Sequence, residues 1–361
     1  MAVLSELPDT FVIKILLRLH VKSLSQCRFV CKSWYNLVRD PYFIHSHLSE
    51  QRDDEKRYLV TAHQFSKTDE YYSFRCAETF VAKLKVERPI YGSREGLSLV
   101  GCAKGLLLIL DLEISDSDLY LWNPSLGKIK CLPSARASCK ISFHKKAFGF
   151  AFFPEICDYK VIRMFGYLVG IYSLRTDSWR IIEKPFEQLF PCYDDRYINA
   201  FYYGLDIAAF VNPFFYWVVK TYEDNHENDF ILSFSIERET FKTISLPVPQ
   251  LEKEGGVLAL FQESHYLFTF RTGYGWNLWM MREDNSSEMC WLKICTFEYQ
   301  DRRPVGFMQN GDVIMEDEKC EVYLHDPRNP SSPRKSEWEM RWEQKYSEVY
   351  NETRRLIKLY R

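Results

Sequence analysis

The sequence lacks the features that mark a membrane, secreted or zinc-binding protein. No apolar stretch reaches the roughly 18 residues of a membrane span, and the first residues do not show the basic segment and apolar run of a secretion signal. The chain has 11 cysteines but no CxxC pair, and Cys27 and Cys31 have no matching second pair for zinc. We therefore expect reduced thiols, no metal and no membrane association in a cytoplasmic or nuclear protein.

Motifs of common enzyme classes are also missing. There is no GxSxG, Walker loop or HExxH. His45 and His47 form a possible metal pair without a third ligand nearby, and the acidic run 223–229 lacks the spacing and central glycine of a calcium loop. The net charge of −2 is too balanced for a general nucleic-acid binder. The sequence therefore predicts a protein that is not an enzyme and needs no cofactor.

Aromatic residues, in contrast, are abundant. The 361 residues suggest two domains, and 9 Trp, 23 Tyr and 26 Phe make up 16% of the chain. Aromatic side chains suit pleated, half-buried surfaces, so this composition favours β structure. The surplus also indicates a large aromatic core or an aromatic recognition surface.

The first forty residues have a helical period instead. Val12, Ile15, Leu16 and Leu19 follow the i, i+3, i+4, i+7 spacing of one helical face. The pattern predicts helix from Leu7 to about Tyr42, with a second helix capped by Ser23 and a stop at Asp40-Pro41. Residues 1–47 have six basic and three acidic side chains, which leaves −5 for the rest of the chain. A small basic module with this many apolar residues suggests an acidic partner with an apolar groove, although packing on the rest of the chain is the alternative.

The motifs of this region resemble the F-box. They are Leu7-Pro8, Ile15-Leu16-x-x-Leu19, Val21-Lys22-Ser23-Leu24, Val30-Cys31-Lys32-Ser33-Trp34 and Asp40-Pro41-Tyr42-Phe43. His20 stands where the family usually has proline. The resemblance implies binding to a Skp-family adaptor and, through it, to a cullin-based ubiquitin ligase. On this basis we expect the following residues to form the adaptor-binding surface: Leu7, Pro8, Val12, Ile15, Leu16, Leu19, Leu24, Val30 and Trp34.

Beyond a charged run at residues 49–57, apolar and polar residues alternate with a period of two, which is typical of β-strands. Strand–turn–strand segments recur at residues 119–133, 169–182, 231–247 and 278–297, with a fifth at 321–330. The first four have apolar anchors in their second strands, at Ile129, Trp179, Phe241 and Trp291. Upstream strand pairs are expected at residues 97–110, 212–220 and 256–270. Repeats of about 50 residues predict an irregular, kelch-like β-propeller, with an irregular β-sandwich as the alternative.

This region resembles the F-box-associated domain of plant F-box proteins. The matching motifs include Gly101-Cys102-Ala103-Lys104-Gly105, Leu121-Trp122-Asn123-Pro124, Phe148-Gly149-Phe150 and Gly311-Asp312-Val313-Ile314. Their spacing is similar to that of S-locus F-box and S-locus-F-box-like proteins, which implies a secreted ribonuclease of pollen self-incompatibility as one target. We expect three regions: the F-box at 1–48, a linker with the first strands at 49–96, and the substrate-recognition domain at 97–361.

Two segments leave alternatives open. The aromatic stretch 191–206 is either core strand or substrate-binding loop, and the loop reading gives Tyr193, Arg196, Tyr197, Tyr202 and Tyr203 as substrate-binding residues. The segment 336–361 has Trp338, Trp342, Tyr346 and Val349 at helical spacing, whereas the family resemblance implies a closing strand near Arg355–Tyr360. Together the sequence predicts a substrate receptor of a Skp–cullin–F-box ubiquitin ligase. The alternative is a propeller that acts outside a ligase, as a scaffold or an enzyme.

Overall fold

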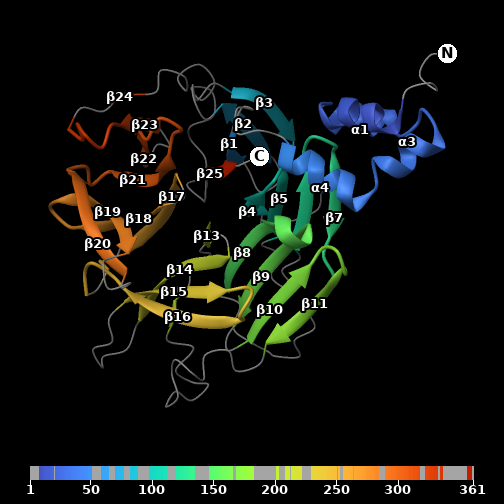
Figure 1. Ribbon diagram of the computed structural model, residues 1–361. Coiled ribbons are helices and arrows are strands. Elements are labelled where there is room, and N and C mark those ends of the chain that lie inside the picture. Colours follow the sequence, from blue (N-terminus) through green and yellow to red (C-terminus); the bar gives the residue numbers. More distant parts are fainter. Residues whose placement is uncertain are drawn as a thin grey trace.

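A computed structural model shows a small helical module beside a large ring of β-sheets (Figure 1). The structure describes residues 8–19, 21–50, 58–64, 70–76, 82–87, 97–111, 119–134, 146–165, 168–182, 201–202, 208–211, 213–221, 229–249, 251–252, 255–262, 264–283, 289–317, 322–331, 334–335 and 356–359. None of the described helices is both long and apolar enough to cross a membrane.

The helical module consists of α1 (Asp9–Leu17), α2 (Val21–Cys27), α3 (Lys32–Leu37) and α4 (Pro41–Glu50). The predicted helical character is confirmed, but two boundaries differ. Ser23 lies inside α2 and does not cap it. The preceding helix α3 already ends at Leu37, and Asp40-Pro41 begins α4, because the Asp40 Oδ1 accepts hydrogen bonds from the backbone N–H groups of Tyr42 (2.8 Å) and Phe43 (3.1 Å).

The strands form six antiparallel sheets, which we call blades 1 to 6. Blade 1 contains, from its inner to its outer edge, β25 (Leu356–Leu359), β1 (Tyr58–Gln64), β2 (Glu70–Cys76) and β3 (Ala82–Glu87). Blade 2 contains β4 (Leu97–Ala103), β5 (Leu106–Asp111), β6 (Leu119–Asn123) and β7 (Lys128–Cys131). Blade 3 contains β8 (Lys146–Phe153), β9 (Asp158–Phe165), β10 (Leu168–Ser173) and β11 (Ser178–Ile182).

Blade 4 has an additional short strand. It contains β12 (Phe201–Tyr202) and β13 (Ala209–Val211), both paired with β14 (Phe214–Thr221), then β15 (Phe230–Ser235) and β16 (Thr240–Ser245). Blade 5 contains β17 (Gly256–Phe261), β18 (Ser264–Arg271), β19 (Gly275–Glu283) and β20 (Met289–Phe297). Blade 6 contains β21 (Arg302–Phe307), β22 (Val313–Asp317), β23 (Val322–His325) and β24 (Arg334–Lys335).

The six blades close into a propeller. Their inner strands β25, β4, β8, β13, β17 and β21 lie next to one another in that order, and β21 returns to β25. Blade 1 combines the first and the last strands of the propeller sequence, because β25 pairs with β1 and places Leu359 opposite Tyr58 (Figure 1). This confirms the predicted propeller and the predicted closing strand, while Trp338, Trp342, Tyr346 and Val349 lie outside the described residues. This radial arrangement leaves only short, protected strand edges.

Aromatic side chains fill the spaces between blades. Trp122 of β6 contacts Tyr72 of β2 at a ring-centroid distance of 5.2 Å, and Phe153 of β8 contacts Phe210 of β13 at 5.3 Å. Between blades 5 and 6, Phe261 stacks on Phe307 at 5.3 Å. Sheets that pack face to face around a ring need large side chains to span the widening gap, so the aromatic surplus belongs in large part to the core.

The predicted repeat is confirmed as the outer hairpin of a blade. Ile129, Trp179, Phe241 and Trp291 lie on the outermost strands β7, β11, β16 and β20. Two residues before the first three anchors, the backbone turns into the left-handed region, with φ of 61°, 51° and 56° at Gly127, Asp177 and Glu239. One expectation was wrong: residues 212–220 contribute the single strand β14, since its neighbours β12 and β13 precede it in the chain.

Strand direction divides the propeller into two ends. Within a four-stranded meander, the turns after the first and third strands lie at one end, and the connections after the second and fourth lie at the other. The chain enters β1 from α4 at the first of these ends, because Tyr58 lies opposite Leu359, the last residue of β25. We call this the F-box end, and the opposite one the distal end.

Candidate partner-binding surfaces

The residues predicted to bind an adaptor fall into two groups. Val12, Leu16 and Leu24 are buried in the core of the helical module, together with Leu17 and Phe43. Side chains covered in this way hold the helices together and are not available at the surface. Leu19 and Trp34 are half-buried against the same core.

The other predicted residues lie at the surface or outside the described part. Pro8 is exposed, Ile15 keeps 49% of its surface exposed and Val30 keeps 60%, whereas Leu7 lies outside the described residues. The contact of this set with an adaptor therefore stays a prediction, and its exposed members are the ones available for contact.

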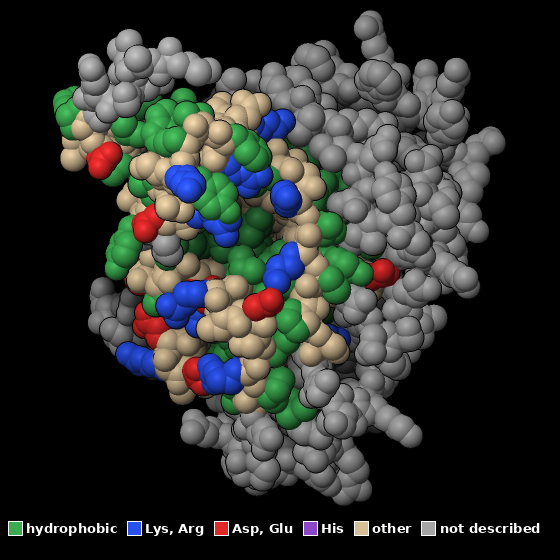
Figure 2. All heavy atoms as spheres, turned by 90° about the vertical axis from the view of Figure 1, so that its right-hand side faces the viewer, with side chains coloured by type: hydrophobic (Ala, Val, Ile, Leu, Met, Phe, Trp, Pro, Cys, Tyr) green, Lys and Arg blue, Asp and Glu red, His purple; other side chains and the backbone are tan. Residues whose placement is uncertain are grey.

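Sequence reasoning missed further exposed apolar side chains on the module. Phe11 lies one helical turn before Ile15 on α1, and both are exposed. Phe29, in the turn after α2, is 78% exposed, and Tyr35 and Tyr42 are exposed on α3 and α4. Figure 2 faces the helical module, and its upper part shows hydrophobic side chains interleaved with those of Lys and Arg. The helical spacing of apolar residues in the sequence identified the helices, but it does not distinguish the apolar positions that face the module's own core from those at its surface.

Positive charge accompanies this apolar surface. The Arg28 guanidinium lies 5.0 Å from the ring centroid of Phe29, and that of Arg39 lies 5.0 Å from the ring of Tyr35. Arg39 also donates a hydrogen bond to the hydroxyl of Tyr35. The surface thus combines exposed aromatic rings with cations, which fits a partner that has apolar and acidic groups.

His47 serves packing in the helical module. Its Nε2 lies 2.9 Å from the carbonyl oxygen of Leu19, and its ring stacks on Phe43 with centroids 6.3 Å apart. The side chain is buried, so it ties α4 to the end of α1. The side chain of His45 is not described.

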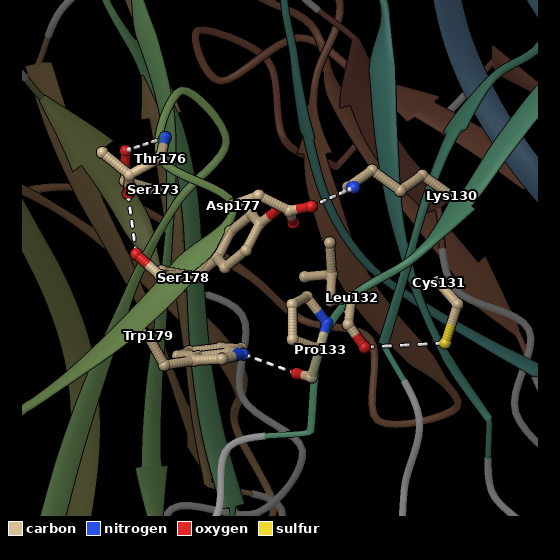
Figure 3. Close-up of polar contacts among 10 residues, drawn as sticks. Lys130, Cys131, Leu132, Pro133, Ser173, Thr176, Asp177, Ser178 and Trp179 are labelled. Atoms are coloured by element: carbon tan, nitrogen blue, oxygen red, sulfur yellow. Dashed lines mark hydrogen bonds and ion pairs between the residues drawn. The ribbon is translucent and has the colours of Figure 1, made fainter.

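The outer edge of blade 3 is fastened to the outer strand of blade 2 and to the residues that follow it (Figure 3). The indole Nε1–H of Trp179 donates to the carbonyl oxygen of Pro133 over 2.7 Å, and the Lys130 ammonium lies 2.7 Å from the Asp177 carboxylate. Lys130 and the hydroxyl of Tyr172 together hold the pKa of Asp177 below its ordinary value. Arg180 repeats the ion pair one blade further on, with Glu239. These charges pair with one another across neighbouring blades.

The residues predicted to bind substrate are only in part described. Tyr202 lies in β12, which pairs with the end of β14, and its side chain is not described. Tyr193, Arg196, Tyr197 and Tyr203 lie outside the described residues. The described residues that flank them, Ile182 and Phe201, belong to the distal end of the propeller. Their role in binding stays a prediction.

A second group of Tyr and Arg residues lies at the distal end and was missed. Tyr274 is 59% exposed in the β18–β19 turn, and the guanidinium of Arg271 lies 4.5 Å from its ring centroid. Arg302 lies between the rings of Tyr299 and Tyr323, at 4.2 Å and 3.7 Å. The signal in the sequence was the turn Arg271–Gly275, where two glycines bracket an exposed tyrosine.

The comparisons with known proteins agree with these observations. Residues 4–46 match the F-box domain family, and residues 70–351 match the family described as "F-box associated beta propeller domain". The chain is 27% identical over 325 residues to the "F-box/LRR-repeat/kelch-repeat protein At2g27520" of Arabidopsis thaliana, a match that covers 87% of this chain and 83% of the relative.

Other matches cover less of the relative. The chain is 26% identical over 254 residues to the "Probable F-box protein At5g47300" of Arabidopsis thaliana, which covers 68% of this chain and 56% of that protein. It therefore spans just over half the length of this relative. Among solved structures, TolB from Acinetobacter baumannii has a TM-score of 0.48 and 13% identity, covering 79% of this chain and 65% of TolB.

Proposed function

The chain belongs to the family of F-box proteins with an F-box associated β-propeller, and from that premise we propose that it is the substrate-receptor subunit of a Skp–cullin–F-box ubiquitin ligase. The observation that most supports this function is the exposed apolar surface of a helical module that already has its own core. Such a surface favours binding to another protein.

The helical module supplies the adaptor-binding site in this proposal. Phe11 and Ile15 of α1, with Phe29 and Val30 after α2, supply apolar contacts to a Skp-family adaptor. Arg28 and Arg39 beside them favour acidic groups on that adaptor. Val12, Leu16 and Leu24 act indirectly, since their burial holds the helices that present this surface.

The propeller binds the target protein and brings it to the ligase. Its contribution is proximity, because a lysine of the bound target then meets the ubiquitin-loaded enzyme at a high effective concentration. No residue of this chain takes part in the transfer, so the protein is an adaptor without catalytic activity of its own. It acts in the cytoplasm or the nucleus, where Skp-family adaptors and cullins work.

For the target, we extend the proposal to a secreted ribonuclease of pollen self-incompatibility. It rests on the similarity of the hairpin motifs to S-locus F-box proteins, which includes Leu121-Trp122-Asn123-Pro124. Binding of the purified propeller-containing chain to a purified S-ribonuclease, together with expression in pollen, tests this assignment. Absence of the chain from pollen contradicts it and leaves the receptor function intact.

Adaptor binding by the full chain tests the receptor function. We expect Ile15→Glu and Phe29→Glu each to lower the affinity for a purified Skp-family adaptor by about tenfold or more, because a carboxylate replaces an apolar contact. Leu126→Glu is the matched control, since Leu126 is an exposed apolar residue on the propeller turn between β6 and β7. Isothermal titration calorimetry measures the affinity of all variants.

Two outcomes would contradict the proposal. The first is an intact protein that does not bind the adaptor, as expected of a propeller scaffold or enzyme that acts outside a ligase. The second is equal adaptor affinity after deletion of residues 1–50, which would place binding on the propeller. Circular dichroism of each variant verifies that the fold is retained.

A further inference from the structure

Three connections between strands lie side by side at the distal end of blades 4, 5 and 6. They are the link from β16 to β17, the turn from β18 to β19 and the link from β20 to β21. The described residues of these connections are 246–249, 251–252 and 255, then 272–274, then 298–301. Since each follows the second or fourth strand of its blade, all three point away from the end where the F-box joins.

Hydrogen bonds fix these connections to one another. The Glu252 carboxylate accepts from the backbone N–H of Thr272 (2.7 Å) and from its hydroxyl, and these bonds lower the pKa of Glu252. The backbone N–H of Gly273 donates to the side-chain oxygen of Gln300 over 3.2 Å. A Cβ on Gly275 would lie 2.2 Å from the carbonyl oxygen of Phe297, so the turn is seated directly against the next link. The three connections therefore form one preorganised surface.

Two arginines on this surface are held by aromatic rings. Arg271 lies over Tyr274, and Arg302 lies between Tyr299 and Tyr323. Within the described part of the chain, neither guanidinium forms an ion pair within 4 Å, although Arg271 is close enough to the Glu252 carboxylate to help lower its pKa, and the buried Nε of Arg302 has no acceptor. Among the described residues, the polar contact of the Arg302 guanidinium is weak, with Nη1 at 3.5 Å from Nε2 of His325. An arginine oriented by stacking keeps its donors available for an oxyanion.

We propose that this distal surface binds an acidic segment of the target protein, with Arg271 and Tyr274 at its centre. The inference rests on the proposed receptor function and names the chemistry of its target. A carboxylate of the target accepts from the Arg271 guanidinium, and an apolar or aromatic side chain of the target packs on the exposed ring of Tyr274. Arg302 adds positive potential beside this contact, and Arg303 follows it in β21.

Acidic side chains also lie on this surface, beside the two arginines. Both hydrogen bonds from Thr272 go to Oε2 of Glu252, and this carboxylate also interacts electrostatically with Arg271. Glu298 and Asp301 are exposed on the last link, on either side of Tyr299 and Gln300.

A defined acidic peptide tests the proposal with the full chain. The probe is a fluorescein-labelled peptide of alternating glutamate and tyrosine, and its matched partner has glutamine in place of glutamate. Fluorescence anisotropy is expected to show binding of the acidic peptide that weakens with added salt, and about tenfold weaker binding of the glutamine peptide.

The decisive comparison is between two charge reversals at opposite ends. Arg271→Glu is expected to lower the affinity for the acidic peptide by about tenfold. Arg238→Glu, an exposed arginine in the β15–β16 turn at the F-box end, is expected to leave it unchanged. Tyr274→Ala supplies a second variant with unaltered charge, for which we expect the affinity for the acidic peptide to fall about fivefold. The fold should be retained, because an exposed turn residue contributes little to folding.

The outcomes separate this inference from the receptor function. No binding of the acidic peptide, or an equal loss in Arg271→Glu and Arg238→Glu, overturns the proposed surface. Adaptor affinity is measured on the same variants. If the adaptor binds all of them while the peptide binds none, the distal surface is wrong and the receptor function stands, whereas loss of adaptor binding by the intact chain overturns the receptor function itself.

Discussion

The indole of Trp179 donates a 2.7 Å hydrogen bond to the carbonyl oxygen of Pro133, which joins the outer strand of blade 3 to the end of blade 2. The same relationship recurs two blades later, where Trp291 donates to the carbonyl of Ser245 over 2.8 Å. Both pairs are 46 residues apart in the chain. The repeated tryptophans therefore link neighbouring blades, in addition to filling the space within a hairpin.

Replacement of Trp179 tests this link. Trp179→Phe removes the N–H donor but keeps a ring against Tyr172, so we expect the free energy of unfolding to fall by about 1–2 kcal/mol. Trp291→Phe is expected to cost a similar amount, because its contact is equivalent. Urea unfolding followed by circular dichroism measures both, and an unchanged midpoint in both variants would show that the hydrogen bonds do not stabilise the ring.

Close packing between blades 3 and 4 gives a second prediction. A Cβ at Gly149 of β8 would lie 2.6 Å from Cδ1 of the buried Phe215 of β14. We expect Gly149→Ala to destabilise the propeller by about 1–3 kcal/mol, because the ring must move in a filled core. Gly306→Ala is the matched control on another inner strand, where an added Cβ meets no atom within 4 Å, and its effect should stay within about 0.5 kcal/mol.

A double variant shows whether the clash is with Phe215. Phe215→Leu alone leaves a cavity, but in the Gly149→Ala background the smaller side chain makes room for the new methyl group. The two changes should therefore cost less together than the sum of their separate effects. Strict additivity would contradict the assigned contact.

The sequence predicted those parts of the structure that depend on local patterns. The anchors Ile129, Trp179, Phe241 and Trp291 all lie on outer strands, because a strand, a turn and a second strand form a hairpin whose period is visible in the chain. The β25 strand was expected from family resemblance, and its partner β1 lies almost three hundred residues earlier, a distance that no local pattern spans.

What the sequence could not supply was the direction in which side chains point after packing. Leu16 and Ile15 are neighbours on α1 and both apolar, yet one is fully buried and the other is 49% exposed. Only the position of α4, whose Phe43 packs in the same cluster as Leu16, decides between them. Likewise, the surface around Arg271 and Tyr274 depends on three connections far apart in sequence, and no single motif marks it.

The turn residue Asp177 allows ion pairing to be separated from backbone strain. Its carboxylate is exposed beside Lys130, so removal of the charge in Asp177→Asn should leave the unfolding midpoint almost unchanged. Its φ of 51° is tolerated by asparagine but disfavoured for a β-branched residue, so Asp177→Val should cost clearly more, about 1–2 kcal/mol. Thermal unfolding of both variants measures this, and equal losses would mean that the strain argument is wrong.

His265 gives the propeller a defined sensitivity to acid. Its ring is 7% exposed and lies 4.1 Å from that of Tyr216, and burial lowers the pKa of the imidazole from 6.5 to about 4. Below pH 6.5 the imidazole of His265 becomes protonated in the unfolded chain, whereas in the folded chain it stays neutral down to about pH 4. The free energy of unfolding therefore decreases as the pH falls from 6.5 to about 4. The full effect is about 3 kcal/mol.

His265→Phe removes the titrating group and keeps a ring against Tyr216. We expect urea unfolding at pH 7 and pH 5 to show a smaller loss of stability for this variant than for the parent chain. Burial also lowers the pKa of His325, so part of the acid sensitivity should remain in His265→Phe and disappear further when His325 is replaced as well. The same pH dependence in His265→Phe and in the parent would mean that His265 is not held neutral by its burial between blades 4 and 5.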